Sequence, residues 1–94
     1  MENYLYEQRW DMGIIRVGMV VKLGPDEVNA YRHGTGEHYI LQPDAFGRLV
    51  AMYLNDMETN EDADPECVVR LGNGDVVRCL GQDICGWGVG VIEV

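Results

Sequence analysis

The chain has 94 residues, of which 47% are hydrophobic, and sixteen acidic residues against seven basic ones give a formal net charge of -9. A chain of this size buries roughly 60–65% of its unfolded surface, so we expect a single domain over residues 1–94 with one modest core. The charge argues against direct nucleic-acid binding and against docking on anionic lipid, because both require a basic surface.

Cysteine and serine usage narrows the class further. Three cysteines are an odd set, and the first fifteen residues lack the basic start and apolar run of a signal peptide. We therefore expect a cytoplasmic protein with free thiols. The longest uncharged stretch, residues 84–92, is too short to span a membrane as a helix. The chain contains no serine, so a serine nucleophile is impossible.

The first half of the chain predicts short strands, at residues 3–9, 14–23, 27–33 and 37–41. The clearest is 14–23, where residues alternate with the period of two that a half-buried strand requires. Turn residues Gly24-Pro25-Asp26 end it. The glycines of Gly34-Thr35-Gly36 predict a hairpin loop between the third and fourth strands.

One helix is predicted at about residues 43–56. Pro43 is favoured at the first helical position, and the Asp44 carboxylate suits the positive end of the helix dipole. Apolar residues then follow with helical spacing and form one stripe: Phe46, Leu49, Val50, Tyr53, Leu54 and Met57.

The second half predicts a hairpin, a turn and a last strand. Residues 67–71 and 75–80 flank Gly72-Asn73-Gly74, a strong short-range hairpin signal. A turn at 81–83 leads to a strand at 87–94, where Gly86, Gly88 and Gly90 share one face. Together these elements predict an α+β fold: a strongly bent antiparallel sheet or small barrel of five to six short strands with the helix packed on it.

The strongest functional feature is a run of six carboxylates in eleven residues, which we call the acidic run: Asp56, Glu58, Glu61, Asp62, Asp64 and Glu66. No basic residue lies between Leu49 and Val69 to neutralise it. It does not form a calcium loop of the EF-hand type, because Glu61 and Cys67 stand where Gly and Glu are required. The run is either a solvated connection or part of a surface that binds a basic protein.

Charged residues of this kind raise association rates, and apolar anchors beside them would supply affinity. The candidate anchors are Tyr4, Tyr6 and Trp10, with Trp87 as a further one. In size and charge the chain resembles the small acidic stoichiometric inhibitors encoded by phages, which include DNA mimics and anti-CRISPR proteins. That resemblance implies a non-enzymatic protein that occupies a basic surface on a nucleic-acid-handling protein.

Two alternatives remain at this point. The chain could be an assembly subunit that forms a homodimer through its terminal strand, using Trp87, Val89 and Val91, because an uncovered sheet edge is a pairing surface. It could also be a small cysteine- or metal-dependent enzyme. Its candidate residues are Cys67, Cys79, Cys85, His33 and His38, but their spacing matches no structural zinc motif. We expect no metal, no cofactor and no catalytic residue.

Overall fold

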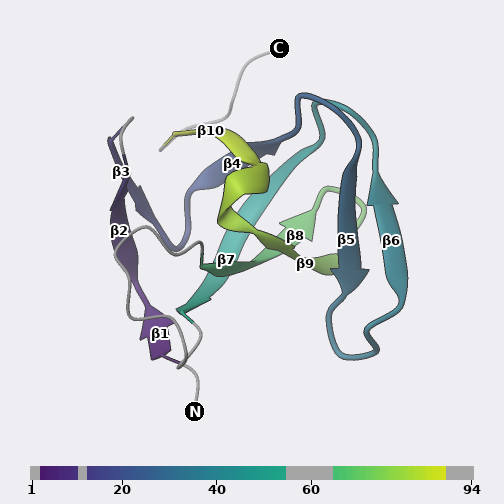
Figure 1. Cartoon of the computed structure of the whole chain (residues 1–94), viewed down its shortest axis with the longest axis horizontal. Coiled ribbons are helices and arrows are strands. Elements are labelled where there is room, and N and C mark those ends of the chain that lie inside the picture. Colours follow the sequence, from purple (N-terminus) through teal and green to yellow (C-terminus); the bar gives the residue numbers. More distant parts are fainter. Residues whose placement is uncertain (1–2, 11–12, 55–64, 89–94) are drawn as a thin grey trace.

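A computed structural model gives the fold of this chain, and it describes residues 3–10, 13–54 and 65–88. These residues form strands and one 3-10 turn (Figure 1): β1 (Asn3–Leu5), β2 (Glu7–Trp10), β3 (Gly13–Arg16), β4 (Val20–Leu23), β5 (Val28–Arg32), β6 (His38–Leu41), β7 (Phe46–Leu54), β8 (Glu66–Leu71), β9 (Val76–Leu80), η1 (Gly81–Asp83) and β10 (Ile84–Gly88).

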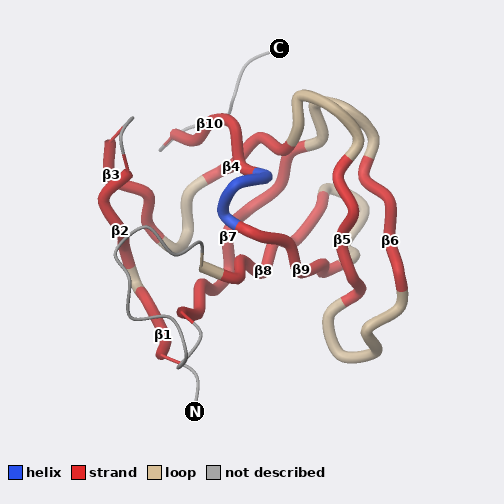
Figure 2. The backbone as a smooth tube through the Cα atoms, in the orientation of Figure 1, coloured by secondary structure: helices blue, strands red, loops and turns tan. Residues whose placement is uncertain are grey.

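Seven of the strands form an open half-barrel sheet in the order β10-β4-β7-β8-β9-β5-β6, with β1 added alongside β7. Each pairing in it is antiparallel. A separate hairpin of β2 and β3 lies on one side of the molecule, and the β5–β6 hairpin lies on the other (Figure 1). The tube in Figure 2 shows how little of the described chain is helical: only the η1 turn.

The predicted helix at about 43–56 is wrong, and with it the α+β class. Residues 46–54 form β7, the nine-residue strand that pairs with β4, β1 and β8. Pro43 and Asp44 lie in a turn closed by a hydrogen bond from Ala45 N to Gln42 O, and Asp44 has a φ of 63°, which a right-handed helix does not allow. Hydrogen bonds to strands distant in sequence therefore override the local helical signal.

A β-bulge interrupts the alternation of β7. The pairing of β7 with β8 shifts register between Leu49 and Ala51. The buried residues of β7 are Gly47, Leu49 and Met52, spaced by two and then by three, because an extra residue in a strand moves every later side chain to the opposite face. Leu49 is the one described residue of the predicted helical stripe that is buried, so the stripe does not mark the inner face of this strand.

The single strand predicted at 14–23 is wrong as well, because these residues form two strands, β3 and β4. The chain turns at Gly18, which has a φ of 102°, and Met19 N donates to Arg16 O there. β3 before this turn pairs with β2, whereas β4 after it pairs with β7 and β10. Glycine accepts this positive φ without strain, and the chain changes sheets at that point.

Both predicted hairpins are confirmed. β5 and β6 pair from Val28↔Leu41 to Tyr31↔His38, around the predicted glycine loop. β8 and β9 pair around Gly72-Asn73-Gly74, where Gly74 has the positive φ of 95°. The predicted turn at 81–83 is the η1 turn, and the last strand begins earlier than predicted, at Ile84; its predicted residues 89–94 lie outside the described residues.

The core lies inside the curve of the half-barrel. Its fully buried side chains come from six of the strands, and the largest are Ile15, Leu23, Leu49, Met52, Val21, Val69 and Val77. One inward row shows the arrangement: Met52 on β7 lies opposite Cys67 on β8, which lies opposite Cys79 on β9. The side chains of the next row along these strands point outward, and they form the candidate site.

Candidate partner-binding surface

Four residues form a cross-strand row on the outer face of the sheet: Tyr4, Tyr53, Glu66 and Leu80. Tyr4 on β1 lies opposite Tyr53 on β7, Tyr53 lies opposite Glu66 on β8, and Glu66 lies opposite Leu80 on β9. Directly opposed residues in antiparallel strands place their side chains on the same face. Tyr4 is 53% exposed and Leu80 is 44% exposed, so the row offers an aromatic and an aliphatic side chain to a partner.

The last residue of the acidic run, Glu66, belongs to this row. In sequence, residues 55–64 join Leu54, the last residue of β7, to Pro65 and Glu66 at the start of β8. Residues 55–64 lie outside the described residues, and so do five of the six predicted acidic partner-binding residues: Asp56, Glu58, Glu61, Asp62 and Asp64. Glu66, the sixth, is described and forms an ion pair with Arg78.

The net charge of the protein is very unevenly distributed. All seven basic residues but only eight of the sixteen acidic ones are in the described residues, which therefore almost balance in charge. Ion pairs neutralise most of those eight: Glu7 with Arg16, Asp44 with Lys22, Glu37 and Asp75 with Arg32, and Glu66 with Arg78. The excess negative charge belongs chiefly to the acidic run.

The predicted aromatic anchors are only partly brought together. Tyr4 packs edge-on against Tyr53, with ring centroids 5.6 Å apart. Tyr6 is 61% exposed and follows β1 directly, outside the row. Trp10 ends β2 in the separate hairpin and pairs there with Gly13, so its backbone is not part of this sheet. The sequence did not predict that Tyr53 and Leu80 contribute to this surface.

The register of the β8–β9 hairpin could have identified Leu80. Arg70↔Val76 is the pair nearest the glycine turn, and counting outward from it places Glu66 opposite Leu80. Tyr53 could not have been found in this way, because the helix prediction placed it in a buried stripe.

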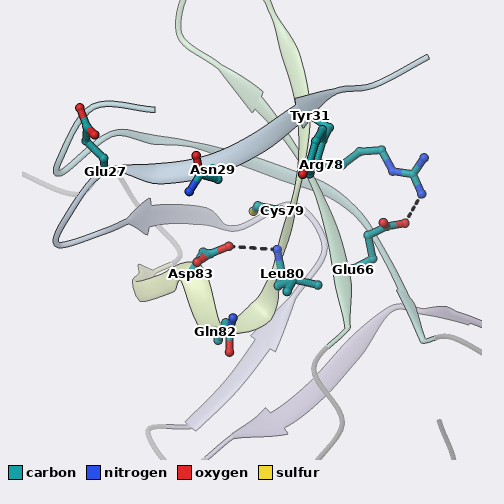
Figure 3. Close-up of a pocket in the computed structure, with 9 residues that line it drawn as sticks. All are labelled: Glu27, Asn29, Tyr31, Glu66, Arg78, Cys79, Leu80, Gln82 and Asp83. Carbon is teal, nitrogen blue, oxygen red and sulfur yellow. Dashed lines mark hydrogen bonds and ion pairs between the residues drawn. The ribbon is translucent and has the colours of Figure 1, made fainter. Parts of the chain in front are cut away.

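A pocket of about 430 Å³ lies next to the row, and we call it the β5–β9 pocket (Figure 3). It is lined by Glu27, Asn29, Tyr31, Glu66, Arg78, Cys79, Leu80, Gln82 and Asp83. β5 and β9 pair only at Tyr31↔Arg78 and Arg32↔Val77, so the two strands separate towards the start of β5. The η1 turn lies across that separation, and in Figure 3 Asp83 and Asn29 approach its centre from opposite walls.

Another polar cluster, centred on Asp75, ties the two hairpins together. The Asp75 carboxylate accepts hydrogen bonds from Tyr39 Oη at 2.8 Å, Arg32 Nη1 at 3.0 Å and Asn73 Nδ2 at 3.2 Å. The Arg32 guanidinium also lies over the Tyr39 ring, 5.1 Å from its centroid. Arg32 pairs in addition with Glu37, so these groups satisfy one another and form a structural contact between β5–β6 and the turn before β9.

We expect Asp75→Asn to lower the free energy of unfolding in a way that depends on pH. The Tyr39 hydroxyl and then the Arg32 guanidinium hold the pKa of Asp75 below its ordinary value of 3.8. A carboxyl whose pKa is lower in the folded state stabilises the fold above its unfolded pKa, and this stabilisation is lost as pH falls through the folded pKa.

Urea unfolding at about pH 7 and about pH 2.5, on either side of an ordinary carboxyl pKa, measures this effect. The variant should be less stable at the higher pH, and the difference from the wild type should shrink at the lower pH, because the stabilisation by the Asp75 carboxylate is lost as pH falls towards its lowered pKa. Asp26→Asn, on an exposed turn, is the matched control and should show no difference at either pH. A deficit of equal size at both pH values would contradict an electrostatic role for Asp75.

The candidate residues of a cysteine or metal enzyme do not converge. Cys67 and Cys79 are buried in the core and Cys85 is exposed, and all three are free thiols. Burial raises the pKa of the Cys79 thiol, which disfavours the nucleophilic thiolate. His38 contacts Asn29, with Nε2 3.0 Å from Oδ1. Among the described residues, which include both histidines and all three cysteines, no group has the composition of a metal site.

The last described strand, β10, makes contacts within its own domain. Trp87 packs against the core, and its Nε1 donates to Ile14 O at 3.1 Å. A Cβ added at Gly86 would lie 3.9 Å from Lys22 Cβ, which is ordinary contact, so no close approach requires glycine there. The other two predicted self-association residues, Val89 and Val91, lie outside the described residues.

Comparison with protein-family models gave no match, and neither did comparison with curated proteins or with solved structures. In the part of the chain that the structure describes, no helix is long and apolar enough to cross a membrane.

Proposed function

We propose that this protein is a non-enzymatic binding protein that occupies a basic surface on a nucleic-acid-handling protein and inhibits it stoichiometrically in the cytoplasm. The observation that supports this proposal most strongly is the coincidence of the acidic run with the cross-strand row. In sequence the run joins the end of β7 to the start of β8, two strands of the row in which Tyr4 and Leu80 are exposed, and it holds six of the sixteen acidic residues.

This arrangement supplies the two components of a protein-binding surface. Carboxylates steer a basic partner towards the contact and select it, whereas exposed aromatic and aliphatic side chains provide apolar area to bury. Six of the carboxylates are concentrated in one run of eleven residues in the sequence. This concentration of charge therefore suits a local basic patch better than it suits imitation of a DNA duplex, whose charge repeats about every 1.7 Å along the axis.

Capture of a partner from a cell lysate tests the proposal with two variants of matched charge. Glu58→Gln/Glu61→Gln/Asp62→Asn removes three charges from the acidic run, and Asp11→Asn/Asp26→Asn/Glu93→Gln removes three elsewhere. We expect the first variant to associate about tenfold more slowly with the captured partner and to respond less to salt, because steering depends on local charge. The second should resemble the wild type.

A similar loss in both variants would mean that only total charge matters. An unchanged association rate and salt response in the first variant would overturn the proposal. Tyr4→Ala adds an independent check, because it should accelerate dissociation without a large change in the association rate.

Self-association through β10 is a second candidate. β10 is the terminal strand in the sheet order, and a strand at a sheet edge can pair with another chain. Sedimentation at several protein concentrations separates the two candidates, because a strict monomer with an intact β10 is compatible only with the first.

A further inference from the structure

The β5–β9 pocket combines a half-exposed aromatic ring, Tyr31, which packs on His38 with ring centroids 5.7 Å apart, with two carboxylates that form no ion pair. Tyr31 is 52% exposed at the pocket wall. Glu27 and Asp83, on either side of the opening, form no ion pair with any of the seven basic residues, all of which the structure describes. The Asp83 carboxylate is held in place by a hydrogen bond from Leu80 N, 3.3 Å from Oδ2 (Figure 3).

The only base in the lining is already neutralised. Arg78 pairs with Glu66, so its charge does not offset Glu27 and Asp83. The Gln82 side chain adds an amide oxygen, a further hydrogen-bond acceptor, whereas the Asn29 oxygen already contacts His38 Nε2 at 3.0 Å. The lining is thus rich in acceptors and carries a net negative charge.

The Cys79 thiol lies at the floor of the pocket. Burial is the main reason that its pKa is raised, followed by the neighbouring Cys67 thiol and then by the negative charges of Asp83 and Glu66.

A second pocket of about 340 Å³ shows that these features are specific to the first. It lies beside β6 and is lined by Tyr39, Ile40, Leu41, Gln42, Ala45, Phe46, Leu71, Gly72 and Asn73. Neither a carboxylate nor a base lines it, so it serves as an internal control for any ligand that binds by charge.

We propose that the β5–β9 pocket binds the guanidinium group of an arginine side chain that the partner protein presents. A guanidinium is planar, stacks on aromatic faces and donates several hydrogen bonds in a fixed fork, whereas an ammonium is a compact and strongly hydrated charge. Tyr31 supplies an aromatic surface, Asp83 supplies the acceptor, and Glu27 adds negative charge at the end of the pocket away from Tyr31 (Figure 3).

This inference rests on the proposed function and identifies the kind of side chain that the partner contributes. Glu66 is both the last residue of the acidic run and part of the pocket lining. A basic surface attracted by the run would consequently bring its side chains next to the pocket opening.

The test uses N-acetyl-arginine amide as the probe and amide chemical-shift changes in the full chain as the readout. N-acetyl-citrulline amide, in which a neutral urea replaces the guanidinium, is the matched control ligand. We expect weak, saturable binding of the arginine probe, with shift changes at Asn29, Tyr31, Gln82 and Asp83. The residues of the second pocket should not shift, and the citrulline probe should bind at least about fivefold more weakly.

Variants separate the contributions to binding. Glu27→Gln changes an exposed side chain and should not disturb folding, whereas Asp83→Asn keeps an oxygen that can accept from Leu80 N. Together they should weaken binding of the arginine probe about tenfold. Tyr31→Leu should weaken it about threefold, because the aromatic face is lost. Asp44→Asn, which removes a carboxylate paired with Lys22 outside the pocket, is the control and should have no effect.

Equal binding of the two probes, shifts centred on the second pocket, or unchanged binding to the Glu27→Gln/Asp83→Asn variant would each overturn the inference. Failure of the proposed function is distinguishable from these outcomes. The arginine probe should still bind to the variant with Glu58, Glu61 and Asp62 changed, whether or not that variant retains its partner from a lysate.

Discussion

Replacement of Gly47 by alanine is expected to lower the free energy of unfolding by about 2 kcal/mol, in the range of overpacked cores. Gly47 is buried in β7, where it pairs with Leu71 on β8 and Val21 on β4. A Cβ at this position would clash with Arg70 O and lie 2.9 Å from Val69 Cγ1. The first of these neighbours is backbone, so the β7–β8 pair would have to separate to admit a methyl group.

Gly72→Ala is the matched control. Gly72 lies in the β8–β9 turn, it does not have a positive φ, and an added Cβ would meet no atom within 4 Å. Its alanine variant should stay within about 0.5 kcal/mol of the wild type, as surface substitutions usually do. Urea denaturation of both variants measures the difference, and equal stabilities would show that β7 and β8 do not approach closely at Gly47.

Met52→Ala should cost more, about 3 kcal/mol, because it leaves a cavity in the centre of the core. Met52 is fully buried on β7, between Leu5 on β1 and Cys67 on β8. Phe46→Ala should cost at most about 1 kcal/mol, because Phe46 is 39% exposed at the start of the same strand.

This pair of variants distinguishes the strand from the predicted helix. The helical stripe included Phe46 and excluded Met52, so a helix at 43–56 would make Phe46→Ala the more damaging change. Because residues 46–54 form the strand β7, we expect Met52→Ala to lower the stability more than Phe46→Ala does. Thermal unfolding followed by circular dichroism gives both stabilities, and a larger loss for Phe46→Ala would contradict the position of β7 in the sheet.

The acidic and basic residues of this protein are unevenly distributed along the chain. A net charge of -9 belongs to the whole chain, yet the described residues hold every base and pair most of their acids. The fold therefore serves as a nearly neutral platform for one acidic segment. Solubility alone would be served equally well by carboxylates spread over the surface.

Local sequence was sufficient where turn chemistry decides the structure. Gly34, Gly36 and Gly74 adopt positive φ in the two hairpin turns, and the strands around these turns pair as predicted. Short loops join strands that are neighbours in the sheet, so their pairing requires no information from distant residues. The acidic run and the exposed Tyr4 are likewise apparent from sequence, because charge is a property of composition and Tyr4 lies in an alternating segment.

Only the tertiary structure decided the nature of residues 43–56 and the location of the candidate site. Residues 46–54 have a helix-like apolar spacing in sequence, and hydrogen bonds to β4, β1 and β8 override it. The row from Tyr4 to Leu80 joins four strands, three of which are far apart in sequence, and the β5–β9 pocket exists because β5 and β9 separate after two paired residues. Sequence determined the charge and the turns of this protein because these are local, whereas long-range strand pairing determined which side chains meet.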